Sequence, residues 1–227
     1  MKYFIVLFLI TYSARSFAKG FKLALIGTHT GKSLSARNTT LSSDGTIVSN
    51  SNTQYGLGLD IALNVNWQLL LDYSSMPYQF DNSKNLITGA EKFSLSSIGA
   101  GLRYILFSRT ALRLMLNSFD DLGLDVRSAQ VEIYRESLIQ GIIHLDQIVY
   151  LGKIIFVGFK VGYGTELSGD KIQNRVSTSY GAFVTYNTGG LGHIESFYEL
   201  ESIKKEDDSL EYVENNSSLS FMYSVKF

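Results

Sequence analysis

Three histidines are the side chains in this sequence best suited to take up and release a proton near neutral pH. His144 stands two positions before Asp146, so in a strand both side chains would point to the same face and the carboxylate would orient the imidazole as a base. His193 opens the run His193-Ile194-Glu195-Ser196, and His29 is expected to be a solvated side chain. For His144 and Asp146 we favour the simpler interpretation, a satisfied polar pair inside the fold.

Other reactive groups are scarce. The chain has no cysteine, which excludes disulfides, thiolate metal sites and cysteine nucleophiles. The Gly-x-Gly pairs lie within extended segments and open no helix, so no phosphate-binding loop is expected. Carboxylates cluster at Asp120-Asp121 and Glu206-Asp207-Asp208, where we expect solvated loop tips and no metal or other cofactor. A formal net charge of −1 argues against nucleic acid as a partner.

The elements that must position these groups are strands. Apolar and polar residues alternate over lengths of about ten residues, the length that a tilted strand needs to cross a bilayer. Ten segments show this pattern: residues 20–31, 53–64, 66–76, 92–106, 109–118, 136–150, 153–165, 175–187, 190–203 and 216–227. The single proline, Pro77, leaves the strands uninterrupted. We expect one all-β domain.

The connections between these segments alternate in length. Tight turns are expected at 64–66, 107–109, 151–152 and 188–190, and long polar loops at 32–52, 77–91, 119–135, 166–174 and 204–215. Short turns at one end and long loops at the other are typical of a closed, antiparallel, up-and-down transmembrane barrel with both termini on the periplasmic side. The pattern predicts about ten strands, with eight as the alternative, since 119–150 can be drawn as one long hairpin arm or with an extra short strand at 128–134.

The two faces of each segment differ in a way that indicates lipid outside. In 153–165 the apolar face carries Val157, Phe159 and Val161, whereas the opposite face carries glycine and Lys160. Small residues beside a lone charge suit the crowded inside of a narrow barrel. Turning the strands over would place Arg103 and Lys160 in lipid at about 2–4 kcal/mol each near the midplane. The small polar face is therefore predicted to line the lumen.

The same register predicts a charge network in that lumen. Its ten members are Lys22, Asp60, Asp72, Arg103, Arg113, His144, Asp146, Lys160, Glu195 and Glu199. A barrel of this size leaves little more interior space than side chains occupy, so we expect the charges to pair off in a plugged or very narrow lumen. A gated, solute-selective channel is the alternative interpretation of the network.

Aromatic residues gather near the two ends of the segments. The two predicted girdles comprise Tyr55, Trp67, Tyr73, Phe93, Tyr104, Phe107, Tyr150, Tyr163, Tyr180 and Tyr186. Such girdles mark the two interfaces of an apolar band about 25 Å tall. The alternative is that they are ordinary sheet aromatics, because tyrosine and tryptophan favour strands in general.

The two ends of the chain indicate export and membrane assembly. Lys2, the apolar run 3–12 and Ser16-Phe17-Ala18 predict a signal peptide over 1–18, with the barrel domain at 19–227. The last segment places Leu219, Phe221, Tyr223, Val225 and Phe227 on one face. With its ten alternating segments, the chain resembles the small outer-membrane β-barrel proteins of Gram-negative bacteria. The resemblance implies a location in the outer membrane, contact with its lipid and lipopolysaccharide, and recognition of the final strand by the barrel-assembly machinery.

The resemblance assigns no active site. Omptin-like proteases place Asp and His pairs at the extracellular rim, and lipid A deacylases use a His-x-Ser pair, and this sequence has neither motif. We expect a non-enzymatic barrel with a structural or surface-interaction role, whose loop ligand is open. The alternatives are a narrow porin-like channel for small solutes and an outer-membrane enzyme that hydrolyses lipid or peptide.

Overall fold

The computed structural model describes residues 20–38, 43–48, 52–79, 92–125, 132–169, 175–189, 192–207 and 210–226, which form one antiparallel sheet. The strands are β1 (Phe21–Asn38), β2 (Ser43–Val48), β3 (Asn52–Ala62), β4 (Trp67–Gln79), β5 (Lys92–Phe107), β6 (Thr110–Asp125), β7 (Glu132–Leu151), β8 (Ile155–Gly169), β9 (Val176–Asn187), β10 (His193–Asp207) and β11 (Leu210–Lys226). Within the described ranges, no helix is long and apolar enough to cross a membrane.

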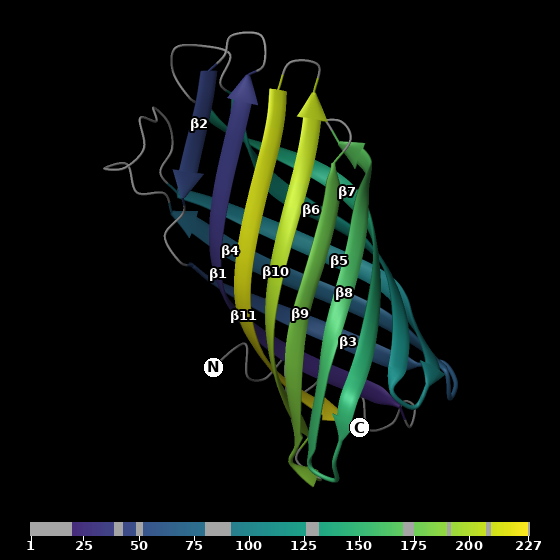
Figure 1. The fold of residues 1–227 in the computed structure, drawn as a ribbon. Coiled ribbons are helices and arrows are strands. Elements are labelled where there is room, and N and C mark those ends of the chain that lie inside the picture. The colour runs from purple at the N-terminus through teal and green to yellow at the C-terminus, as the bar shows by residue number, and fades with distance from the viewer. Residues whose placement is uncertain are drawn as a thin grey trace, which may run out of the picture.

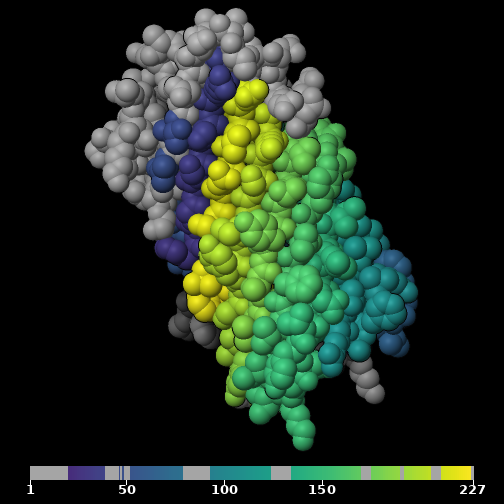
Figure 2. Space-filling view, viewed as in Figure 1, coloured from purple at the N-terminus to yellow at the C-terminus, as the bar shows by residue number. Residues whose placement is uncertain are grey.

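The sheet closes on itself where the first and last strands meet. β11 pairs with β1 from Lys22↔Lys226 to Asn38↔Leu210, and Figure 2 shows the two side by side. On its other edge β1 pairs with β3 over Phe21–Thr30 and with β2 over Ser33–Asn38, so β2 and β3 share one position in the wall. The result is a closed barrel of ten strands (Figure 1), which confirms the predicted fold and excludes eight strands.

Tight turns join the strands at one end of the barrel. Between β3 and β4 the Asn64 side chain accepts hydrogen bonds from the backbone N–H groups of Asn66 and Trp67, both at 2.9 Å. Between β9 and β10, Gly189 and Gly192 have φ values of 72° and 115°, which favour glycine. β1 begins and β11 ends at this same end of the barrel.

At the other end, the strands continue past the points where we predicted loops. β1 runs on to Asn38, β6 to Asp125, and β10 and β11 are separated by residues 208–209 alone. Residues 132–134 belong to β7, and the rest of the predicted extra strand at 128–134 lies outside the described residues. The strand criterion failed here because the outward residues become polar, as Ser33 and Ser35 do on β1, although the alternation itself continues. The wall therefore extends beyond its apolar band.

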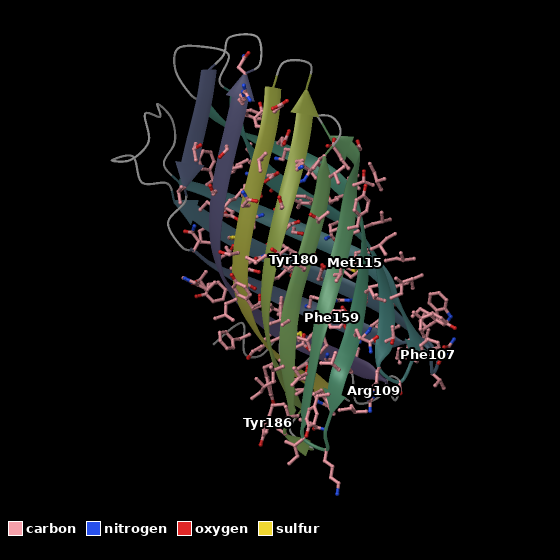
Figure 3. The ribbon with its side chains drawn as sticks, viewed as in Figure 1. Phe107, Arg109, Met115, Phe159, Tyr180 and Tyr186 are labelled. Carbon is pink, nitrogen blue, oxygen red and sulfur yellow. The ribbon has the colours of Figure 1, made fainter. Side chains whose placement is uncertain are left out.

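The apolar face of the sheet points outward. Leu57, Phe159 and Tyr223 are each more than 40 % exposed on the outer surface, while Lys160 on the opposite face is buried. In Figure 3, Phe107 and Tyr186 lie toward the tight-turn end and Tyr180 lies farther along the barrel. An outer wall of large exposed apolar groups suits a lipid surrounding better than water.

Candidate functional site in the barrel lumen

The structure places all ten residues of the predicted charge network on the wall of one cavity. This lower cavity, nearer the tight turns, has a volume of about 460 Å³. Its charged lining comprises Lys22, Asp60, Asp72, Arg103, Arg109, Arg113, His144, Asp146, Lys160, Glu195 and Glu199. Period-two alternation brings these side chains together, because each strand contributes every second residue to the interior.

Charge pairing in the lower cavity centres on Asp146. Its carboxylate lies 2.6 Å from the Arg113 guanidinium and 4.0 Å from that of Arg103. Lys22 and Asp60, on neighbouring strands, lie 3.7 Å apart. These side chains remain 11–32 % exposed, because they border the cavity.

His144 and Asp146 do not form the predicted pair. Asp146 is engaged by arginines, and no hydrogen bond joins it to His144 among the described contacts. The Nδ1 atom of His144 is buried and has no hydrogen-bond partner among the residues that the structure describes. An imidazole without its orienting carboxylate lacks the arrangement that a general base needs.

The other predicted network residues described below do not join the ion pairs around Asp146. Lys160 lies over the Phe197 ring, 3.8 Å from its centroid, where cation–π attraction stabilises the ammonium group. Glu195 accepts a hydrogen bond of 3.1 Å from the Thr185 hydroxyl. Asp72 occupies the space that a side chain on Gly99 would need, which explains a glycine at that lumen position. Glu199 has no ion pair among the described residues.

A second cavity, of about 360 Å³, adjoins the first. Asn117, His144, Phe197 and Glu199 line both cavities. The upper cavity is rich in hydroxyl and amide groups, and several of these bond across its wall, as Gln140 does to Ser177 at 2.7 Å. A packed cluster of charged side chains, among them Lys32, Asp121 and Arg175, forms part of its wall.

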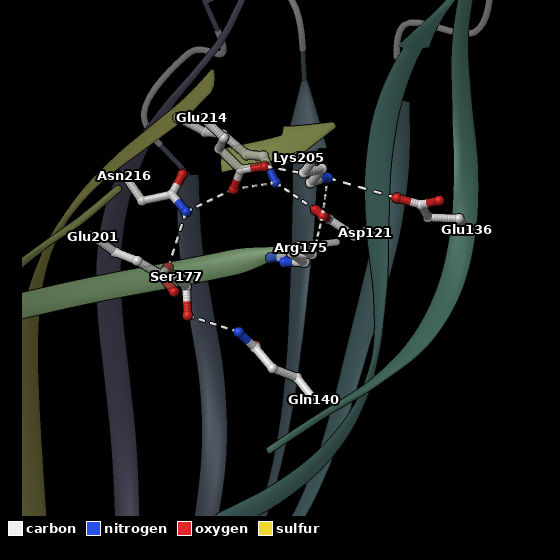
Figure 4. Close-up of polar contacts among 10 residues, drawn as sticks. Asp121, Glu136, Gln140, Arg175, Ser177, Glu201, Lys205, Glu214 and Asn216 are labelled. Atoms are coloured by element: carbon white, nitrogen blue, oxygen red, sulfur yellow. Dashed lines mark hydrogen bonds and ion pairs between the residues drawn. The ribbon is translucent and has the colours of Figure 1, made fainter. Parts of the chain in front are cut away.

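Asp121 is the centre of that cluster (Figure 4). It lies 2.7 Å from Lys32 of β1 and 2.6 Å from Lys205 of β10, and it also pairs with Arg175, which precedes β9. All four side chains are 2–4 % exposed. One carboxylate on β6 thus joins β1, β10 and the residue that precedes β9.

Further carboxylates surround the same cations. Glu214 lies 2.9 Å from Lys32 and 3.9 Å from Lys205, and Glu136 lies 3.6 Å from Lys205. The Asn216 amide donates to Glu214 at 2.7 Å and to Glu201 at 3.2 Å (Figure 4). We call the set Lys32, Asp121, Glu136, Arg175, Glu201, Lys205, Glu214 and Asn216 the upper cluster.

Sequence reasoning missed the upper cluster. Lys32, Asp121, Lys205 and Glu214 fell within the predicted loops, and Asp121 was interpreted as a solvated loop carboxylate, which is wrong. The signal that would have found them is the alternation that continues past the apolar band, with Lys32, Leu34 and Ala36 all buried on β1.

The upper cluster lies beyond the apolar band, since the outward residues of β10 change from Leu200 to Ser202 and Lys204 there. Burial acts to raise the pKa of Asp121, but Arg175, Lys205 and Lys32 together hold it well below its usual value. Glu201 differs, because burial and the nearby Glu214 raise its pKa to about 7. The Asp121 carboxyl group is therefore ionised at neutral pH, whereas the Glu201 carboxyl group gains or loses its proton near pH 7.

An apolar cluster lies farther still from the tight turns. It comprises Leu34, Ala36, Tyr78, Leu95, Leu122 and Tyr212, with Met76, Phe93 and Tyr134 packed against it. Leu122 follows the inward Asp121, so simple alternation would turn it outward, yet it is fully buried. The end of β6 therefore reaches across the lumen to β1 and β11.

Phe93 corrects one predicted girdle residue, because it packs with this apolar cluster inside the barrel and not at the membrane interface. Its pairing with the buried Tyr78 fixes that orientation. The other nine predicted aromatics, Tyr55, Trp67, Tyr73, Tyr104, Phe107, Tyr150, Tyr163, Tyr180 and Tyr186, are exposed or partly exposed. The Trp67 and Tyr104 rings are in contact near the tight-turn end, with centroids 4.6 Å apart and planes tilted by 39°.

The final strand presents the predicted apolar face. Leu219, Phe221 and Tyr223 are exposed on the outside of β11, and Val225 is partly exposed. Phe227, like the predicted signal peptide over 1–18, lies outside the described residues.

Comparison with known proteins gives likeness in structure and none in sequence. No protein-family model and no curated sequence matches the chain. The outer membrane protease OmpT from Escherichia coli superposes with a TM-score of 0.57 at 9 % identity, covering 92 % of this chain and 97 % of OmpT. The translocator domain of autotransporter NalP from Neisseria meningitidis gives 0.49 at 12 % identity, with 95 % and 92 % covered, and Ail of Yersinia pestis gives 0.36 at 14 %, with 91 % and 100 % covered. Identities this low carry no activity across. The chain therefore shares the fold of the Gram-negative outer-membrane β-barrels, and closes it with ten strands.

Proposed function

We propose that this protein is an integral outer-membrane barrel with a structural or surface-interaction role, exported by a signal peptide in 1–18 and assembled through its last strand. It has no catalytic function in this proposal, and its lumen does not conduct. The observation that carries the proposal is that, at the end of the barrel away from the tight turns, the upper cluster and the apolar cluster join β6 across the lumen to β1, β10, β11 and Arg175.

Closure of this kind suits a rigid support. Ion pairs that tie opposite walls hold the rim in one shape, and a buried pair broken at one partner costs about 3–5 kcal/mol. The wall also continues beyond the apolar band. Surface connections on a rigid scaffold are where binding residues are usually found.

The histidines do not favour an enzyme. His29 is exposed on the outer face of β1, whereas His144 lines both cavities without the carboxylate partner that the sequence predicted. The upper cluster has carboxylates but no imidazole, and His144, which lines the same cavity, has a buried Nδ1 atom with no hydrogen-bond partner among the described residues. The likeness to OmpT supports the fold and no more.

Orientation can be tested with single cysteines, because the native sequence contains none. Arg37→Cys lies at the far end of β1 and Ser108→Cys in the tight turn between β5 and β6, and both native side chains are exposed. A membrane-impermeant maleimide added to intact cells should label Arg37→Cys. It should label Ser108→Cys only after the outer membrane has been permeabilised. Labelling of neither in membranes, or the reverse pattern, would contradict the proposed placement.

A narrow channel is the second candidate, and the two adjoining cavities favour it. Planar-bilayer recordings of the purified full-length chain separate the two functions. A closed support gives no discrete openings at moderate voltages, whereas a channel gives openings whose ion selectivity depends on lumen residues such as Lys160 and Glu199. Openings of the unmodified protein would replace the first proposal with the second.

A further inference from the structure

The upper cavity has an excess of negative charge that the lower cavity lacks. Five carboxylates and two cationic side chains line it: Asp120, Asp121, Glu199, Glu201 and Glu214 against Lys32 and Arg175. The lining of the lower cavity has five of each sign. Arg135 and Lys205 pair with carboxylates of the upper cavity, but Glu199 and Glu201 have no ion pair among the described residues.

Glu201 lowers the stability of the fold when it is ionised. Burial and the nearby Glu214 raise its pKa to about 7, because Arg175 does not outweigh them. Its side chain accepts a hydrogen bond of 3.2 Å from the uncharged Asn216 amide. A destabilising carboxylate that lines a cavity indicates a binding role, since perturbed groups of this kind gather at functional sites.

The two unpaired carboxylates are separate along the lumen. Glu199 and Glu201 lie two positions apart on β10, so their Cα atoms are about 6–7 Å apart on the inward face. Glu199 lines both cavities and pairs in register with Ser218 of β11, whereas Glu201 pairs with Asn216. In the described part of the chain, no three acidic or histidine side chains are arranged to hold a metal ion. The site therefore suits two separate positive charges.

Unsatisfied oxygen atoms accompany both carboxylates. Asn117, which lines both cavities as Glu199 does, has a buried Oδ1 atom with no hydrogen-bond partner among the described residues. The Oδ1 atom of Asn216, beside Glu201, is in the same state. Buried acceptors without a partner call for a donor. An ammonium group provides three N–H donors and no acceptor.

We propose that the upper cavity binds a linear diamine, with one ammonium group at Glu199 and the other at Glu201. Ile142, Phe119 and Phe197 line the same cavity and provide apolar surface for the methylene chain between the two charges. A neutral sugar would also bond to the hydroxyl and amide groups, but it would leave both carboxylates without a counter-charge.

The cavity can hold such a molecule and can be reached. Its volume of about 360 Å³ falls in the range of small-molecule sites. Ser108 and Arg109, at the tight turn between β5 and β6, line the adjoining lower cavity. The two cavities together therefore lead from the tight-turn end to the proposed site, so binding does not require the opposite end to open.

Glutamine substitutions along β10 provide a matched test. Glu199→Gln and Glu201→Gln each remove one proposed contact. Glu195→Gln makes the same change two positions before Glu199, at a side chain that lines the lower cavity and accepts from Thr185. The full chain and each variant would be purified in detergent micelles and titrated with putrescine by isothermal calorimetry at about pH 8, where Glu201 is ionised. Butylamine, with the same methylene chain and one ammonium group, is the ligand control.

The expected result is equal putrescine affinity for the native chain and Glu195→Gln, and at least about tenfold weaker binding by Glu199→Gln and by Glu201→Gln. Butylamine should bind the native chain at least about tenfold more weakly than putrescine does. Absence of putrescine binding by the native chain would overturn the proposal.

Three other results would also overturn it. Equal weakening by Glu195→Gln would indicate general charge attraction, equal affinity for butylamine would indicate a site for one ammonium group, and displacement of putrescine by an equal concentration of Mg²⁺ would indicate a metal site. Heat-modifiable gel mobility checks that each variant is folded. If Glu199→Gln does not fold, Glu201→Gln and the butylamine comparison on the native chain still decide the outcome.

Discussion

The two halves of the lumen use the same residue types in different ways. In the lower cavity, pairs such as Lys22 with Asp60 border open space and stay partly exposed. In the upper cluster, Asp121 and its three cations are nearly inaccessible and tie opposite walls together. Charge in a barrel interior can thus either line a hydrated space or replace an apolar core, and burial decides which.

The two halves should therefore respond differently to the loss of one charge. A cation beside a hydrated cavity loses little when its partner is removed, because water solvates it. A cation inside the upper cluster has no such replacement. Unfolding free energies measured by urea titration in detergent micelles, with the single tryptophan, Trp67, as the fluorophore, test this contrast.

Asp121→Asn should have the largest effect, a loss of about 3–5 kcal/mol in unfolding free energy, because it leaves three buried cations without their shared anion. Asp120→Asn is the matched control. Asp120 pairs with Arg135, whose side chain is 52 % exposed, so water can solvate the cation that the substitution leaves behind, and the loss should be clearly smaller. Equal effects at the two positions would remove the distinction between the cluster and the surface.

Leu122→Ala should cost about 2–5 kcal/mol, because it opens a cavity in the apolar cluster that joins β6 to the facing wall. Leu116→Ala, on the outer face of the same strand, keeps its contact with detergent or lipid and should cost clearly less. If this contact closes the lumen at the end away from the tight turns, Leu122→Ala should also show conducting openings in planar-bilayer recordings, which the native chain lacks. If Leu122→Ala showed no openings and had the same unfolding free energy as the native chain, β6 would not close the lumen.

Glu201→Gln should raise the unfolding free energy at pH 8, relative to the native chain, by about 1–3 kcal/mol. The folded-state pKa of Glu201 is raised to about 7, above its unfolded value, so its contribution to stability is complete below the unfolded pKa and is lost as pH rises through about 7. The variant should therefore match the native chain near pH 4 and be more stable at pH 8. Parallel pH profiles of the two chains would contradict the raised pKa.

Lys22→Gln should have the smallest effect, about 1 kcal/mol or less, because its pair with Asp60 is 3.7 Å long and a quarter exposed. Lys32→Gln is the comparison within the upper cluster and should cost several times more. A large loss from Lys22→Gln would mean that the lower cavity also acts as a core, and the contrast between the two halves would disappear.

Much of the fold followed from local sequence. Whether Lys160 or Phe159 points inward is a property of period-two alternation, which each strand carries by itself, and the lower lumen was predictable for that reason. The tight turns were predictable because they break that alternation over two or three residues. The ten-strand closure followed from counting such segments.

Other features were decided by tertiary structure alone. Asp121 meets Lys32, Lys205 and Arg175 across 89, 84 and 54 positions of sequence, and no local pattern says which strands face each other across a closed barrel. Phe93 and Leu122 pack inside because of the strand that each one meets there. The sequence determined which face of each strand points outward, since that depends on neighbouring residues only. Barrel closure and the reach of β6 decided which inward charges became a packed cluster, since that depends on distances across the lumen.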